Sequence, residues 1–103
     1  MINGNNFQGS LPKDLFYMES MESMAIYNNQ LTGSLPIDAV LNKLKGFYAM
    51  NNKLTGTIPS WIERASQLEY LGLGHNFLNG TIPQFIFDLP MLSYGEHNIF
   101  LTF

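Results

Sequence analysis

Four evenly spaced copies of one short pattern constrain this chain more than any other feature of its sequence. Each copy opens with an asparagine and closes with a proline, and the copies begin at Asn5, Asn29, Asn52 and Asn76. The steps between these asparagines are 24, 23 and 24 residues. A fixed period in this range indicates a solenoid, in which each repeat forms one coil and buries its apolar side chains by stacking on its neighbours.

The letters of the pattern identify the kind of repeat. Residues 68–83 read L-x-x-L-x-L-x-x-N-x-L-x-G-x-I-P, and the second half recurs upstream as NNFQGSLP, NQLTGSLP and NKLTGTIP. This consensus resembles that of leucine-rich repeats, and its L-T-G-x-I-P half resembles the plant-type subfamily. The resemblance covers residues 1 to about 90. We therefore predict an α/β-type leucine-rich-repeat solenoid, with short parallel strands on the concave face and 3₁₀ or irregular turns on the convex face.

The pattern also predicts where the repeats end. We number the repeat positions so that each pattern asparagine is position 9, and we expect positions 1, 4 and 6 to point inward from a strand. About four coils are then predicted within residues 1–89. Beyond them, the 24-residue frame puts Leu92, Gly95 and His97 at positions 1, 4 and 6, and only the leucine fits. Residues 90–103 are thus predicted to form a degenerate fifth repeat or a loose C-terminal tail.

The segments after each proline are predicted to form the convex side. Apolar residues there recur every three residues, a period that favours 3₁₀ turns over an amphipathic α-helix. The second unit is one residue short between Pro36 and Leu44, so we expect a tighter convex turn there. We expect Trp61, just after Pro59, to pack against a neighbouring coil.

The pattern asparagines and glycines have predicted structural roles. A side-chain amide both donates and accepts, so Asn5, Asn29, Asn52 and Asn76 are expected to form a ladder that satisfies buried backbone groups of adjacent coils. Gly9, Gly33, Gly56 and Gly80 are expected where the backbone takes an unusual φ or leaves no room for a Cβ. The resemblance implies that this half of each repeat forms a second, lateral strand.

Composition excludes several classes of protein. The 103 residues carry a formal charge of −3, which gives no electrostatic reason to expect a nucleic-acid partner. With no cysteine, the chain has no disulfide framework and lacks the cysteine-bearing caps that extracellular relatives usually carry. The first residues do not resemble a signal peptide, and no apolar run is long enough to span a membrane. The chain therefore resembles the middle of a longer solenoid or a truncated relative of one.

No residue set predicts catalysis. His75 and His97 could approach each other on neighbouring coils, but only Glu96 is near as a further metal ligand, so we predict no metal site, no cofactor and no enzyme. Asn79 begins the sequence N-G-T, which is a glycan acceptor if the chain is secreted and otherwise only the repeat consensus.

The concave strand face is the predicted binding site. Its outward positions 3, 5, 7 and 8 combine tyrosines with small and amide residues, a composition suited to recognition, although tyrosines also favour strands for structural reasons. The candidate ligand-binding residues are Tyr27, Asn28, Tyr48, Met50, Asn51, Tyr70 and His75. Solenoids generally bind partners through such extended concave surfaces.

The resemblance leaves three functions open. The first is a non-catalytic module that binds a protein or peptide, as part of a receptor-like kinase or receptor-like protein ectodomain, which implies an extracellular or plasma-membrane-associated location. The second is an inhibitor of a cell-wall hydrolase, similar to polygalacturonase-inhibiting proteins. The third is a truncated fragment without independent function. We also expect self-association through uncapped ends, where Phe7 and Leu11 of the first coil and Phe100, Leu101 and Phe103 of the tail are predicted to be exposed.

Overall fold

Short parallel strands and 3₁₀ turns alternate along the computed structural model, which describes residues 8–80, 83–90 and 99–100. The elements in chain order are β1 (Gln8–Ser10), η1 (Lys13–Tyr17), β2 (Ser23–Ala25), β3 (Gln30–Thr32), β4 (Gly46–Tyr48), η2 (Ser60–Arg64), β5 (Tyr70–Gly72), η3 (Gln84–Asp88) and β6 (Ile99–Phe100). We name each coil after its pattern asparagine, so that β2 belongs to the Asn29 coil and β4 to the Asn52 coil. The solenoid predicted from the sequence is confirmed.

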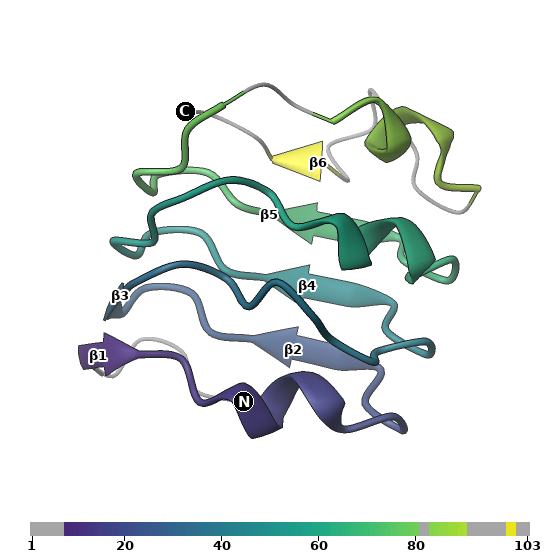
Figure 1. Ribbon diagram of the computed structural model, residues 1–103, viewed down its shortest axis with the longest axis horizontal. Coiled ribbons are helices and arrows are strands. Elements are labelled where there is room, and N and C mark those ends of the chain that lie inside the picture. Colours follow the sequence, from purple (N-terminus) through teal and green to yellow (C-terminus); the bar gives the residue numbers. More distant parts are fainter. Residues whose placement is uncertain (1–7, 81–82, 91–98, 101–103) are drawn as a thin grey trace.

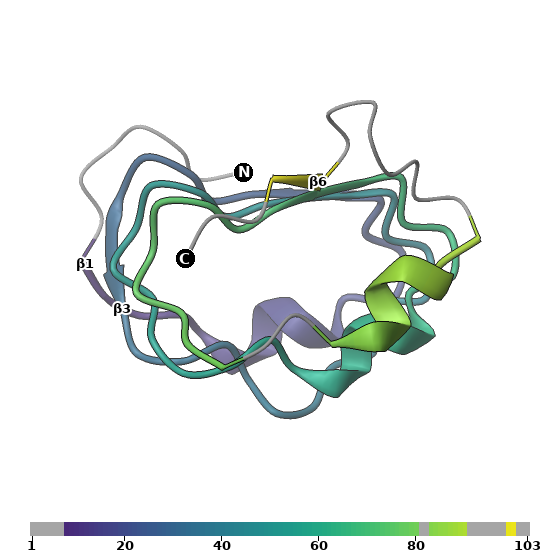
Figure 2. The ribbon, with the colours of Figure 1, turned by 90° about the horizontal axis from the view of Figure 1, so that it is seen from above.

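Two parallel sheets hold the coils together. The larger sheet has the order β2-β4-β5-β6 and forms one face of the stack (Figure 1). In it, Ser23 lies opposite Gly46 and Gly46 opposite Tyr70, so equivalent repeat positions are paired. The second sheet pairs β1 with β3 at the side of the stack, and the 3₁₀ turns lie across the interior from the strand face (Figure 2).

The core consists of rungs of equivalent apolar residues, one from each coil. Position 4 is filled by Met24, Phe47 and Leu71, which are 3%, 0% and 0% exposed. Positions 6 and 11 repeat this arrangement with Ile26, Ala49, Leu73 and Leu31, Leu54, Leu78. The inward positions predicted from the repeat are therefore buried, except that Met21 at position 1 is only partly buried. Leu11 is also buried, contrary to the expectation that it is exposed at the end of the stack.

The last strand does not follow the 24-residue frame. Ile99 pairs with Leu71, so position 4 of this coil is Ile99 rather than Gly95. The pairing thus departs by four residues from the 24-residue frame, which would put Gly95 at position 4. In the other coils position 4 carries a buried apolar residue, and the sequence offers isoleucine at the paired position 99 but glycine at position 95. Leu92, Gly95 and His97 themselves lie outside the described residues.

The convex side carries a 3₁₀ turn after Pro12, Pro59 and Pro83, as predicted. The Asn29 coil differs, because residues 37–43 contain no helix. The tighter turn expected for this shorter coil is thus an open loop, and it carries Ile37, which is 87% exposed.

A cluster of aromatic residues connects neighbouring coils next to this loop. Trp61 is 2% exposed, and its indole N–H donates to the carbonyl of Pro36 at 2.9 Å, which confirms that it packs against the neighbouring coil. Its ring also meets Phe16 and Phe47 edge-on, at centroid distances of 5.8 and 5.9 Å. Edge-to-face contacts of this kind stabilise a core beyond the area they bury.

Candidate functional site

Three tyrosines run diagonally across the strand face. Tyr27 occupies position 7 of its coil, Tyr48 position 5 of the next and Tyr70 position 3 of the one after, so each ring is shifted by two residues. Small residues occupy the outward positions on both sides of this tyrosine diagonal, namely Ser23, Ala25, Gly46, Gly72 and Gly74. The structure therefore brings together the three predicted tyrosines as one stripe, although they are scattered in sequence.

The central tyrosine is held in place by its neighbours. Tyr48 and Tyr70 stack with ring centroids 6.2 Å apart and planes inclined by 27°. The Tyr48 ring also lies over Gly46, where an added Cβ would be 2.6 Å from a ring carbon. Burial raises the pKa of the Tyr48 hydroxyl, and Tyr70 and Glu69 raise it further. Tyr48 is therefore a neutral hydrogen-bonding group at physiological pH.

A hollow of about 390 Å³ lies beside this stripe. It is lined by Ser23, Ala25, Tyr27, Tyr48 and Met50. Ala25 is one of these lining residues and is only 5% exposed, although it occupies an outward position. Of the predicted ligand-binding residues, the hollow unites Tyr27, Tyr48 and Met50.

The three predicted residues at position 8 have a backbone role that the sequence prediction missed. Asn28, Asn51 and His75 have φ values of 58°, 59° and 54°. Asparagine and histidine are enriched in this left-handed conformation, which most side chains avoid. The Asn51 amide also donates to the side-chain oxygen of Asn28 at 2.7 Å on the exposed surface. Their choice at position 8 is explained by the turn, and Asn28 and Asn51 directly follow Tyr27 and Met50, which line the hollow.

The pattern asparagines bridge pairs of coils. Asn52 accepts a hydrogen bond from the backbone N–H of Leu31 at 3.2 Å and donates to the carbonyl of Ile26 at 2.8 Å, both in the preceding coil. It also donates to the carbonyls of Ala49 and Met50 in its own coil. Because Asn52 is only 6% exposed, these bonds satisfy backbone groups that water does not reach.

The same arrangement is repeated in the next coil. Asn76 accepts from the backbone N–H of Leu54 at 3.0 Å and donates to the carbonyl of Ala49 at 2.9 Å. Asn29 is 7% exposed and donates to two carbonyls of its own coil. Asn5 lies outside the described residues. Asn52 and Asn76 thus connect neighbouring coils through their side-chain amides.

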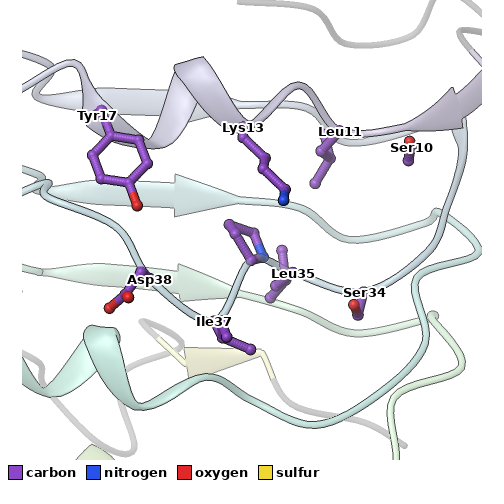
Figure 3. A pocket seen from close by; sticks show the side chains of 9 residues that line it. Ser10, Leu11, Lys13, Tyr17, Ser34, Leu35, Ile37 and Asp38 are labelled. Carbon is purple, nitrogen blue, oxygen red and sulfur yellow. The ribbon is translucent and has the colours of Figure 1, made fainter.

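A second hollow lies away from the strand face. It has a volume of about 520 Å³ and lies between the first coil and the open loop of the Asn29 coil (Figure 3). Lys13 and Tyr17 project from η1 on one side, and Ile37 and Asp38 lie on the other. The missing 3₁₀ turn of the Asn29 coil leaves this space open.

The remaining predicted features occupy the surface or lie outside the described residues. Asn79 is exposed, but Thr81 of its N-G-T sequence is not among the described residues. Within the described ranges, no cluster of three or more metal-ligating side chains occurs. Glu96 and His97 fall outside those ranges. No described helix is long and apolar enough to cross a membrane.

The parallel strand ladder, the bridging asparagines and the 3₁₀ turns define the class of protein, a leucine-rich-repeat solenoid. The Leucine Rich Repeat family pattern matches residues 67–89. Receptor-like protein 18 of Arabidopsis thaliana is 31% identical over 97 residues, which cover 93% of this chain and 12% of that protein. The chain thus spans about an eighth of the length of this relative.

Solved structures show the same relationship. The leucine-rich-repeat ectodomain of the Arabidopsis membrane receptor kinase GASSHO1/SCHENGEN3, in complex with CASPARIAN STRIP INTEGRITY FACTOR 2, matches with a TM-score of 0.83 and 30% identity, covering 88% of this chain and 11% of that one. The Arabidopsis receptor kinase HAESA, in complex with the peptide hormone IDA and the co-receptor SERK1, matches with a TM-score of 0.82 and 29% identity, covering 90% and 16%. The chain belongs to the plant-type leucine-rich-repeat family of receptor-like proteins and receptor kinases. Neither the family nor these neighbours point to a catalytic activity.

Proposed function

We propose that this chain is a peptide-recognition segment of a plant-type leucine-rich-repeat receptor, and that the peptide binds across the strand face. The observation that carries the proposal is the tyrosine diagonal with its adjoining hollow. Tyr70 is 42% exposed and Tyr27 is half-buried, so both present aromatic surface that no core contact requires. Tyrosine offers large contact area at low entropic cost, which suits a binding surface.

The related structures support the same reading. HAESA is seen with the peptide hormone IDA and GASSHO1/SCHENGEN3 with CASPARIAN STRIP INTEGRITY FACTOR 2, and both share the fold of this chain. Because the chain matches only 11% and 16% of those ectodomains, the ligand of this segment is inferred from its own surface. We also place the binding event outside the cell, since GASSHO1/SCHENGEN3 is matched through its ectodomain. Finding the tagged gene product in the cytosol would contradict that location.

The test is a binding comparison between the two faces. Peptides of about twelve residues, enough to cross three coils of a repeat stack, are selected from a display library on the chain. We expect Tyr27→Ala and Tyr70→Ala to weaken the selected peptides by about 2 kcal/mol, or roughly thirtyfold. Thermal unfolding of these variants should change by no more than about 0.5 kcal/mol, as for other surface substitutions.

The matched controls are on the convex side. Lys13 and Arg64 are exposed, and Arg64 makes only a long contact of 3.9 Å to Asp38. Lys13→Ala and Arg64→Ala should leave both binding and stability unchanged. If the convex variants lose the peptides while the tyrosine variants keep them, the ligand does not bind the strand face.

A further inference from the structure

The hollow beside the tyrosine diagonal fits one kind of ligand group. We propose that it is an anchor pocket for a single aromatic side chain of the bound peptide, held between Tyr27 and Tyr48. This inference rests on the proposed function and names the chemistry that the strand face selects. It concerns one position of the ligand, and its test requires no knowledge of the natural peptide.

The walls of the hollow favour a flat apolar group. Tyr27 and Tyr48 supply two rings and Met50 supplies a polarizable thioether. The other two lining residues, Ser23 and Ala25, are small. Aromatic rings gain more from edge-on or offset contact with other rings than burial alone provides. Methionine sulfur also makes favourable contacts with aromatic rings. At about 390 Å³, the open hollow has room for a two-ring side chain such as that of tryptophan.

The uncharged lining of the hollow disfavours a charged ligand group. Charged residues occur at position 2, where Glu22 and Lys45 pair with each other at 3.2 Å and Glu69 raises the pKa of Tyr48. A charged side chain entering the hollow would lose hydration and find no opposite charge in the lining, which is unfavourable. The exposed amides of Asn28 and Asn51, next in sequence to two lining residues, can meet the polar backbone of a peptide.

Gly46 lets the Tyr48 ring take its position in the wall of this pocket. The Tyr48 ring occupies the space that a side chain at position 46 would need, with an added Cβ only 2.6 Å from the ring. Any larger residue at this position must displace the Tyr48 ring, which also stacks on Tyr70. The φ of Gly46 lies outside the left-handed region, so alanine is compatible with the backbone there. Gly46→Ala is therefore a steric probe that leaves every lining side chain in the sequence unchanged.

The experiment uses fluorine NMR on the whole chain labelled with 3-fluorotyrosine. Each tyrosine signal is assigned with a Tyr→Phe variant, and N-acetyltryptophanamide is added as the probe. We expect the Tyr27 and Tyr48 signals to shift and saturate, with half-saturation on the order of 1–10 mM because so small a ligand gains little binding energy. Tyr17 is 50% exposed and lines the second hollow, so its signal reports whether the probe binds there instead, and we expect it not to shift.

Two variants and two further probes sharpen the result. Gly46→Ala should abolish the saturable shift at Tyr48. Ser23→Leu should do so independently, because Ser23 is an exposed residue that lines the hollow and a leucine side chain there would fill it. N-acetyl-lysinamide and N-acetyl-aspartamide should produce no saturable shift in the parent chain. The proposal is overturned if Tyr17 responds like Tyr27 and Tyr48, if the charged probes bind as well as the tryptophan probe, or if both variants retain binding.

The outcome can be separated from that of the proposed function. If the strand face binds peptides without an aromatic anchor, the tyrosine variants lose the selected peptides but the tryptophan probe gives no selective shift. If the pocket exists on a surface that binds no peptide, the probe shifts Tyr27 and Tyr48 while no peptide depends on these residues. Agreement of both experiments is expected, with aromatic residues enriched at one position of the selected peptides.

Discussion

Neighbouring asparagines in the same turn have different functions at the residue scale. Asn52 is 6% exposed and bonds backbone groups of two coils, whereas the adjacent Asn51 is exposed and takes a φ of 59°. The first is explained by the hydrogen bonds of its side chain, and the second by the backbone conformation that asparagine tolerates. Identical residue types therefore contribute to stability through different physical effects.

This difference leads to a stability prediction. Asn52→Ala removes an acceptor from Leu31 and a donor from Ile26, both buried, and should cost about 1–3 kcal/mol of unfolding free energy. The control is Asn51→Gly, because glycine keeps the left-handed turn and should change stability by only a few tenths of a kcal/mol. Alanine at position 51 would be strained there and is unsuitable as a control. Urea midpoints measure both, and equal midpoints would show that the ladder bonds contribute nothing.

Close packing between coils explains the pattern glycines at the element scale. Each has a φ between 81° and 90°, and three of them also face a hydroxyl side chain of the preceding coil. An added Cβ would meet Ser10 at 3.5 Å from Gly33, Ser34 at 3.1 Å from Gly56 and Thr57 at 3.2 Å from Gly80. Gly9 has the same conformation but nothing within 4 Å. The lateral half of the repeat thus combines a backbone requirement with a packing requirement.

These two requirements can be separated by substitution. Gly9→Ala should cost about 1–2 kcal/mol through left-handed strain alone. Gly56→Ala adds a contact of 3.1 Å with Ser34, so we expect it to cost a further ~1 kcal/mol or more by overpacking. Differential scanning calorimetry of the two variants provides the comparison. Equal losses would mean that the coils move apart freely and that only the backbone conformation matters.

At the scale of the whole molecule, exposed apolar residues and unpaired sheet edges favour self-association. Ile37 and Phe77 are 87% and 64% exposed, and β2 and β6 are the outer strands of the strand-face sheet. Stacked repeats need neighbours or polar caps on their terminal coils, and unpaired strand edges promote association. The predicted exposure of Phe7 and of the tail residues Leu101 and Phe103 lies outside the described residues.

We therefore expect the 103-residue chain to self-associate when isolated. Sedimentation velocity at tens of micromolar, roughly the range where exposed apolar surface aggregates, should show dimers or larger species. Ile37→Ser is a control that removes exposed apolar surface on the open loop without touching a sheet edge, and association through the edges should survive it. A monomer throughout this concentration range would contradict the prediction.

The repeat period, the inward positions and the bridging residues can all be predicted from the sequence. These features depend on a pattern that each coil repeats, so one copy predicts the environment of the next. Leu71 at position 4 and Asn76 at position 9 are examples, since both lie where the repeat places them.

The features that depend on differences between adjacent coils emerge only when the coils pack together. The Tyr48 ring lies over Gly46 of its own strand and stacks on Tyr70 of the next strand. This stack forms because Gly46 and Tyr70, 24 residues apart in the sequence, are paired between β4 and β5. The pairing of Ile99 with Leu71 likewise departs from the regular spacing of the repeat. A repeat pattern averages over such differences, whereas packing depends on the particular side chains that face one another.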